Sequence, residues 1–295
     1  MSPLLINKII LGTVQLGLEY GINNTKGKPS SEEALEILKS AYSSGIRILD
    51  TAEAYGNAHE VIGTYHRQNP NKRFEVITKC NAEQLVASKK KFKEQLFRSL
   101  EDLEVDRLNS YLFHSFEHYQ QFEHWDVLET FLAQDQIGKI GVSVYFNNQV
   151  NIVAEDSRIS LVQLPFNLLD NNSYRGMALS ILKENGKEVH TRSVFLQGLF
   201  FKDRESLGKL SPLRESLLKL DILSGSVPTD IGTLALGYSL HQCCIDKILI
   251  GIETEKQLQH NLQMLSKVEK IPTEIYNAID QVIVENSSLL IPTNW

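Results

Sequence analysis

The chain has 295 residues, of which 42% are hydrophobic, and this is enough for one large domain or two ordinary domains with a substantial core. A formal net charge of −6 and a pI near 5.8 argue against a nucleic-acid partner. No apolar run reaches the roughly 18 residues of a membrane span, and the first residues lack the apolar core of a signal peptide. The three cysteines are too sparse for a disulfide framework. We therefore expect a cytoplasmic protein, a monomer or a small homo-oligomer, with no membrane partner.

Short β-branched runs alternate with longer amphipathic segments from one end of the chain to the other. This alternation predicts eight strands, each followed by a helix. In chain order the predicted strands are Ile9–Thr13, Ile46–Asp50, Phe74–Lys79, Ser110–His114, Lys139–Ser143, Leu161–Pro165, Glu188–Ser193 and Lys247–Gly251.

Local patterns predict where several of the helices begin. The first helix starts at a capping box, Ser30-x-x-Glu33, and stops at Gly45. Pro228 is expected to open the helix before the eighth strand. A capping pattern that begins at Thr254 predicts the start of the last regular helix.

Eight βα units in a chain of this length predict one (β/α)8 barrel, a TIM barrel, as a single domain over residues 1–295. Two surplus segments are expected: an extra loop, Leu199–Val227, between the seventh strand and its helix, and a C-terminal extension after Lys270. The competing architecture is a doubly wound sheet, which would need a Gly-x-Gly-x-x-Gly turn after an early strand. The sequence has no such turn, so we favour the barrel.

Four polar residues lie at or just past the carboxyl ends of predicted strands, and in a barrel these ends converge at one rim. A lysine ammonium beside a tyrosine lowers the pKa of the phenol, and a carboxylate keeps the lysine charged. The pattern therefore predicts Tyr55 as the proton donor to a carbonyl oxygen that a neutral His114 polarises, while a nicotinamide delivers hydride to the carbon. Lys79 would tune the acidity of Tyr55, with Asp50 as the anchor of Lys79.

Each of these residues also has an ordinary structural explanation. Asp50 could cap the following helix, Tyr55 could be a loop aromatic, and Lys79 could extend from a strand end to solvent. His114 is followed by His118, but the segment between them lacks the His-Glu-x-x-His pattern of a metal-binding helix. We therefore expect no metal site.

Several segments, in this order, resemble the aldo-keto reductase superfamily, and the resemblance covers nearly the whole chain. The most specific is Leu49–Gly56, which reads Leu-Asp-Thr-Ala-Glu-Ala-Tyr-Gly and is followed by Glu60 and Gly63. The others are Leu11–Thr13, Ile77–Lys79, Phe113–His114, Gly141–Ser143, Gln163–Asp170, and Ile248–Gly251 with Gln257, Leu258 and Asn261. The resemblance implies a barrel enzyme that reduces a carbonyl compound with NADPH and without a metal, NADH being the alternative cofactor.

The resemblance also implies which residues hold the cofactor. It assigns the nicotinamide carboxamide to Ser143 and Gln163, although these two could instead be interior polar residues that satisfy each other. It assigns the adenine side to Gln257 and Asn261. The full set expected to contact the cofactor is Gly12, Thr13, Asp50, Ser143, Gln163, Arg192, Phe195, Gln197, Gly251, Glu253, Gln257 and Asn261.

Three departures from the family pattern concern the cofactor. Val144 replaces an asparagine that often follows the serine, which removes one carboxamide contact. Arg192 occupies the place where an aromatic usually stacks on the nicotinamide; a guanidinium plane can also stack, but it repels the oxidised, cationic ring. We therefore expect NADP⁺ to leave faster than in relatives with an aromatic there, and more slowly in Arg192→Tyr. Glu253 and Glu255 beside Lys256 predict only a weak preference for NADPH over NADH.

Loops at the mouth of such a barrel set the substrate. The residues expected to contact it are Tyr20, Tyr55, His114, Phe116 and Trp125, and terminal Trp295 is a further aromatic candidate. The segments Gln15–Gly21 and Ser193–Leu199 resemble bacterial aldo-keto reductases associated with surface-sugar biosynthesis. This likeness implies a keto-sugar or a small aldehyde as the substrate.

Two other functions fit the same residues. A lyase of the class I aldolase type would use Lys79 to form a Schiff base with a carbonyl substrate. A non-catalytic NADPH-binding subunit of a larger assembly would keep the cofactor site without turnover. Borohydride trapping on Lys79 separates the lyase from a reductase.

Overall fold

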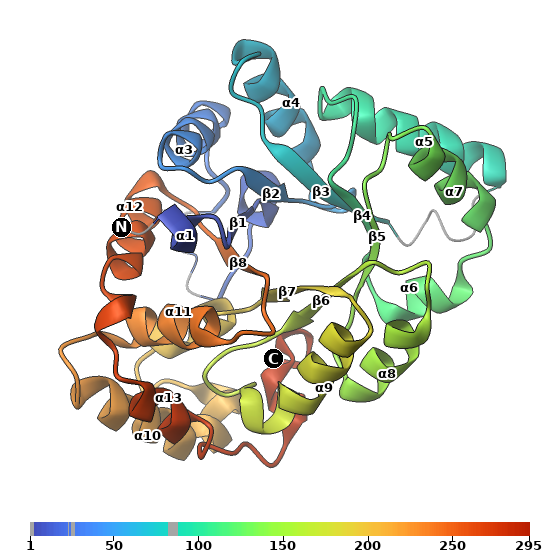
Figure 1. Ribbon diagram of the computed structural model, residues 1–295. Helices are drawn as coiled ribbons and strands as arrows, with labels where there is room; N and C mark the ends of the chain where they lie inside the picture. Colours follow the sequence, from blue (N-terminus) through green and yellow to red (C-terminus); the bar gives the residue numbers. More distant parts are fainter. Residues whose placement is uncertain (1–2, 23, 25–26, 82–87) are drawn as a thin grey trace.

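Eight parallel strands, neighbours in chain order, form a closed barrel in the computed structural model (Figure 1). The structure describes residues 3–22, 24, 27–81 and 88–295. The strands are β1 Ile9–Gly12, β2 Ile48–Asp50, β3 Glu75–Cys80, β4 Ser110–Phe113, β5 Ile140–Ser143, β6 Leu161–Pro165, β7 Glu188–Arg192 and β8 Lys247–Gly251. The prediction of a (β/α)8 barrel is therefore confirmed.

The longer helices surround the barrel on its outside (Figure 1). In chain order they are α3 Ser31–Ser43, α4 Ala58–Gln68, α5 Lys89–Asp102, α7 Trp125–Ala133, α8 Asn147–Glu155, α9 Asn172–Glu184, α11 Ile231–His241 and α12 Glu255–Leu265. Three short helices are α1 Pro3–Ile6, α2 Val14–Gly17 and α6 Phe116–Gln121. No helix in the described part of the chain is both long and apolar enough to cross a membrane.

The two surplus segments lie where the sequence predicts them. The stretch between β7 and α11 is more ordered than a loop, because it contains two 3-10 helices and a further α-helix, η2 Leu196–Phe201, η3 Gly208–Leu213 and α10 Arg214–Gly225. The tail after β8 and α12 adds η4 Val268–Lys270, α13 Thr273–Ile279, η5 Ser287–Leu290 and η6 Pro292–Asn294.

Capping groups set the observed helix starts. Ser30 accepts a hydrogen bond from the Glu33 amide (3.2 Å), and Glu33 accepts one from the Ser30 amide (2.8 Å), so the predicted box is present. Thr254 likewise caps α12. The prediction that Pro228 opens a helix is wrong, because α11 begins at Ile231, where the Asp230 side chain accepts from the Thr233 amide.

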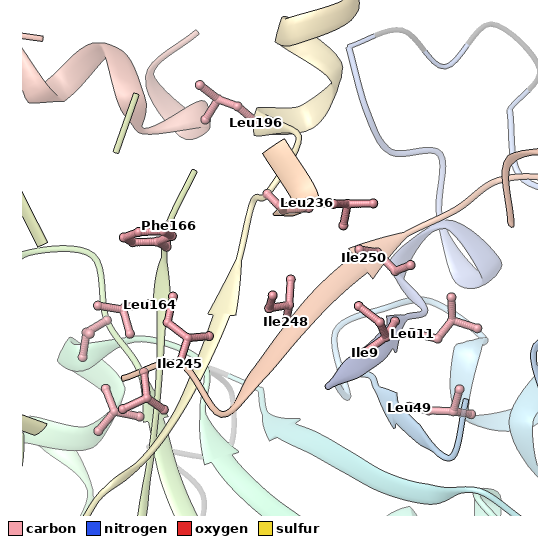
Figure 2. Close-up of a cluster of buried hydrophobic side chains, with 14 of the residues drawn as sticks. Ile9, Leu11, Leu49, Leu164, Phe166, Leu196, Leu236, Ile245, Ile248 and Ile250 are labelled. Carbon is pink, nitrogen blue, oxygen red and sulfur yellow. The ribbon is translucent and has the colours of Figure 1, made fainter. Parts of the chain in front are cut away.

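Successive side chains along each strand point alternately outward and inward, and this divides the core into two parts. In β1, Ile9 and Leu11 point outward and pack between the barrel and its helices, as do Ile248 and Ile250 of β8 (Figure 2). Ile10 points inward and meets a small inner cluster completed by Ile77, Leu112 and Leu161. Side chains pack the interior of a barrel of this kind, so a ligand site is expected at its carboxyl-terminal rim.

Candidate active site

A cavity of about 760 Å³ opens at the carboxyl ends of the strands, a volume typical of small-molecule and cofactor sites. Its wall contains all four of the predicted catalytic residues: Asp50, Tyr55, Lys79 and His114. It also contains all twelve residues that the sequence places against a cofactor: Gly12, Thr13, Asp50, Ser143, Gln163, Arg192, Phe195, Gln197, Gly251, Glu253, Gln257 and Asn261. Residues far apart in the sequence thus share one site.

Lys79 and Asp50 form a buried ion pair in the floor of this cavity. The Lys79 ammonium also donates to the Thr51 carbonyl at 3.1 Å. The second carboxylate oxygen of Asp50 accepts a hydrogen bond from the Gln163 amide at 2.9 Å. Asp50 therefore does not cap a helix, and the amide of Gln163 is held by Asp50 rather than by Ser143. Burial lowers the pKa of Lys79, whereas the charge of Asp50 opposes this shift.

Tyr55 and His114 lie edge to face above this pair, with ring centres 5.6 Å apart and an interplanar angle of 75°. The Lys79 nitrogen is 5.5 Å from the centre of the Tyr55 ring. Burial, followed by the charge of Asp50, raises the pKa of Tyr55 above its ordinary value. The net shift is therefore upward, and the lowering effect expected of Lys79 stays a prediction. Because Asp50 is paired with Lys79, the phenol is exposed to the negative charge of Asp50 as well as to the positive charge of the ammonium.

His114 is uncharged at neutral pH. Burial, and then the nearby ammonium of Lys79, lowers the pKa of His114 to about 3. A neutral imidazole has one N–H group that can donate a hydrogen bond to a carbonyl oxygen without adding a charge. A neutral His114 is therefore able to polarise a carbonyl group by donating a hydrogen bond to its oxygen, as predicted for it.

Two glycines hold the Tyr55 loop in place: Gly56, which ends the Leu49–Gly56 segment, and Gly17, to which the sequence assigned no role. A Cβ on Gly17, in α2, would lie 1.8 Å from the Tyr55 carbonyl oxygen, and one on Gly56 would lie 2.4 Å from the Gly17 carbonyl. Gly56 also has φ +54°, a left-handed conformation that favours glycine. This close packing of α2 against the loop fixes the backbone that carries the phenol.

Arg192 lies at the end of β7 and in the cavity wall. Its guanidinium stacks on the Tyr145 ring, 4.0 Å from the ring centre, and donates to the Val144 carbonyl at 3.2 Å. The Tyr145 backbone is itself fixed, because its carbonyl accepts a hydrogen bond from Arg175 at 2.8 Å. Arg175 belongs to a buried ion pair with Asp170. Tyr145 and this ion pair are site features that the sequence did not reveal.

Glu53, in the segment between Asp50 and Tyr55, is buried behind the site. Its carboxylate accepts hydrogen bonds from the Asn81 amide (3.0 Å), the Ser99 hydroxyl (3.2 Å) and the Tyr111 hydroxyl (2.9 Å). Burial raises the pKa of Glu53 to about 7, against the lowering effect of these donors. Through these hydrogen bonds Glu53 links the Tyr55 loop to the end of β3 and to β4. The sequence around Glu53 did not predict this structural role.

The titration of Glu53 predicts a change of stability with pH. A carboxyl group whose pKa rises from about 4.5 to about 7 on folding binds its proton more tightly in the folded state. Its contribution to the free energy of unfolding is therefore complete below pH 4.5 and is lost as the pH rises through 7. The loss amounts to about 3 kcal/mol. Urea unfolding at pH 5 and pH 8 should show most of this loss in the free energy of unfolding of the wild type relative to Glu53→Gln. A stability difference between the two proteins that does not change with pH would contradict it.

The predicted substrate wall is only partly present. Tyr20 lies in the cavity wall and its hydroxyl accepts a hydrogen bond from Gln197 at 2.7 Å. Phe116 and Trp125 are not among the described residues of the wall, because both pack into the outer core. Terminal Trp295 also packs there, and the tail reaches the cavity through Thr293 instead. Residues 23, 25 and 26, a short distance after Tyr20 in the sequence, lie outside the described residues.

The far end of the cavity is formed by the loop after β8 and the first turns of α12. Gln257 and Glu253 are linked by hydrogen bonds, and Lys256 and Asn261 line the same wall. Gln15 contributes an amide oxygen that is buried without a hydrogen-bond partner among the described residues. One cavity therefore runs from the four predicted catalytic residues Asp50, Tyr55, Lys79 and His114, here called the tetrad, to α12. It offers polar groups along its length, which fits an elongated dinucleotide. No group of three or more potential metal ligands occurs in the described part of the chain.

Proton donation to a carbonyl, beside a cavity that fits a dinucleotide, is the chemistry of barrel enzymes that reduce carbonyl compounds with NAD(P)H. The comparison with known proteins supplies the family. The chain belongs to the Aldo/keto reductase family, whose model matches residues 8–284. It is thus an NAD(P)H-dependent oxidoreductase.

Individual relatives are distant. The uncharacterized oxidoreductase YqkF of Bacillus subtilis strain 168 is 26% identical over 287 residues, covering 89% of this chain and 88% of its own length. Aldo-keto reductase AKR11C1 from Bacillus halodurans, in its holo form, is similar in structure, with a TM-score of 0.73, 21% identity, and coverage of 95% and 94%. PA4992 of Pseudomonas aeruginosa, provisionally described as an aldo-keto reductase, gives a TM-score of 0.65, 19% identity, and coverage of 89% and 90%. The two structural similarities concern the fold.

Proposed function

We propose that this protein reduces an aldehyde or ketone to an alcohol, with Tyr55 as the proton donor. The observation that carries the proposal is the single cavity in which Tyr55, His114 and the Lys79–Asp50 pair share a wall with the groups that follow β8. A bound reduced nicotinamide would supply the hydride. The chain's own residues then have to orient the carbonyl and provide a proton to its oxygen.

The side chains divide this work between them. His114, neutral because its pKa is about 3, donates a hydrogen bond to the carbonyl oxygen and polarises it. Tyr55 keeps its proton at any working pH, because its pKa is raised, and gives it up only as negative charge develops on that oxygen. Lys79, charged and held by Asp50, stabilises the phenolate that results.

For the cofactor we propose NADPH, with NADH accepted as well. Lys256 is the one lysine or arginine in the described wall near α12, and it lies close in sequence to Glu253 in the same wall. The N-terminus of α12, capped by Thr254, favours a phosphate group. An adjacent carboxylate weakens this preference. The holo form of the similar Bacillus halodurans enzyme supports a bound cofactor in this fold.

For the substrate we propose a keto-sugar or a small aldehyde. The described wall near the tetrad includes the hydroxyl groups of Tyr20 and Thr293 and the amide of Gln197. These groups can exchange hydrogen bonds with a substrate that carries hydroxyls of its own.

A lyase that uses Lys79 is the second candidate. Burial favours the neutral amine that a Schiff base requires, and this is the observation in its favour. Against it, the Lys79 nitrogen is already engaged by Asp50 and the Thr51 carbonyl. The ion pair therefore favours the reductase.

The two functions are separated by one set of measurements. Titration with NADPH and with NADH, followed by quenching of protein fluorescence, should show binding of both with less than about tenfold preference. A panel of carbonyl compounds that includes keto-sugars should then reveal oxidation of the cofactor at 340 nm. Borohydride trapping of a substrate on Lys79, without any cofactor binding, would establish the lyase instead.

A further inference from the structure

Arg192 brings a positive charge into the cavity. Its guanidinium contacts the Tyr145 ring and the Val144 carbonyl, and no carboxylate among the described residues lies within ion-pair distance of it. Asp50 is paired with Lys79, and Asp170 is paired with Arg175. Glu253 and Lys256 belong to the other end of the cavity, after β8. Counted over the described residues, the part of the cavity near Tyr55 and His114 therefore has a net positive charge.

The position of this charge is fixed. Tyr145, on which the guanidinium stacks, is held through its carbonyl by Arg175, whose own charge is anchored to Asp170 at 2.6 Å. The Arg192 backbone belongs to β7, and its carbonyl accepts a hydrogen bond from the Phe166 amide at 3.1 Å. A stacked, hydrogen-bonded guanidinium cannot move away from a ligand without losing these contacts.

The charge acts on the place where hydride transfer must occur. The reacting ring has to meet a carbonyl whose oxygen contacts Tyr55 and His114, so it occupies the same part of the cavity as these side chains. Burial and Lys79 are the main reasons for the low pKa of His114, and Arg192 lowers it further. Arg192 also lines the same cavity as Tyr55 and His114, so its guanidinium can act on a charge at this point.

We propose that Arg192 makes the protein select the reduced cofactor over the oxidised one. This inference rests on the proposed function. The reduced nicotinamide is neutral, whereas the oxidised ring carries a positive charge, and only the oxidised ring is repelled by the guanidinium. The same repulsion makes hydride donation within the complex less favourable. What the protein gains is a site that rejects oxidised cofactor before the reaction and releases it afterwards, so product inhibition by NADP⁺ is weak.

The test is the ratio of two dissociation constants, measured by isothermal titration calorimetry without any turnover. In the wild type, NADPH should bind at least about tenfold more tightly than NADP⁺. In Arg192→Gln this ratio should fall by about tenfold, and in Arg192→Lys, which keeps the charge, it should stay within about threefold of the wild type. Arg98→Gln, the same change on an exposed site of α5, is the matched control and should leave the ratio unchanged.

Each outcome decides something. A folded Arg192→Gln that binds both forms with the wild-type ratio overturns the role of Arg192 and leaves the proposed function intact. A wild-type ratio below about tenfold overturns it as well, and this result needs no variant that has to fold. If the wild type binds neither NADPH nor NADP⁺, and neither NADH nor NAD⁺, the proposed function fails together with the inference.

Discussion

Tyr55→Phe should lower the turnover number for carbonyl reduction by at least about 100-fold while the dissociation constant for NADPH changes by less than about twofold. The change removes one hydroxyl group and keeps the ring that packs edge to face on His114. Burial and the Asp50 charge raise the pKa of this phenol, so the group holds a proton ready at neutral pH. Single-turnover kinetics and calorimetry would measure the two quantities separately.

A matched control for this variant is Tyr42→Phe. Tyr42 is a phenol of α3 that packs on Phe74 and Arg47, on the outside of the barrel. It should keep wild-type turnover, which shows that loss of a hydroxyl alone is harmless. If Tyr55→Phe retains more than about a tenth of the turnover, the proton comes from another donor, such as His114 or water, and the role of Tyr55 is wrong.

The fold could be predicted from the sequence because its physical basis is local and repeated. Each β-branched run is followed by a helical pattern, and the barrel then brings the strand ends together. The positions of Asp50, Lys79 and His114 follow from this topology alone. The start of α11 was misplaced because Pro228 and Asp230 are both start signals, and the side chain that actually accepts the hydrogen bond is that of Asp230.

The parts of the site that the sequence did not reveal depend on contacts between distant segments. Phe116 and Trp125 come after β4, where residues of a substrate wall are expected. Trp125 instead packs on the rings of Phe113 and Tyr119 in the outer core. The raised pKa of Tyr55 depends on burial, which spacing does not report. No linear motif indicates that Arg175 clamps the Tyr145 carbonyl, because these residues are brought together only by folding.

Lys79→Met should destabilise the protein by about 3–5 kcal/mol and abolish turnover. Lys79 and Asp50 have side chains that are 2% and 3% exposed, so removing the ammonium leaves a carboxylate without its counter-charge in a buried place. The Gln163 amide satisfies one oxygen of Asp50 by a hydrogen bond, but it brings no net charge. The free energy of unfolding, measured with urea at pH 7, should fall accordingly.

The double variant Asp50→Asn/Lys79→Met distinguishes a stabilising role from a catalytic one. Removing both charges leaves no uncompensated ion, so the double variant should be more stable than Lys79→Met by about 2 kcal/mol or more. Turnover should not recover with it, because the phenolate of Tyr55 still lacks a neighbouring ammonium. Recovery of stability without recovery of turnover would show that the Lys79–Asp50 pair is required for proton transfer and is not required for folding. Recovery of turnover in the double variant would exclude Lys79 from the reaction and leave Tyr55 and His114 to act without it.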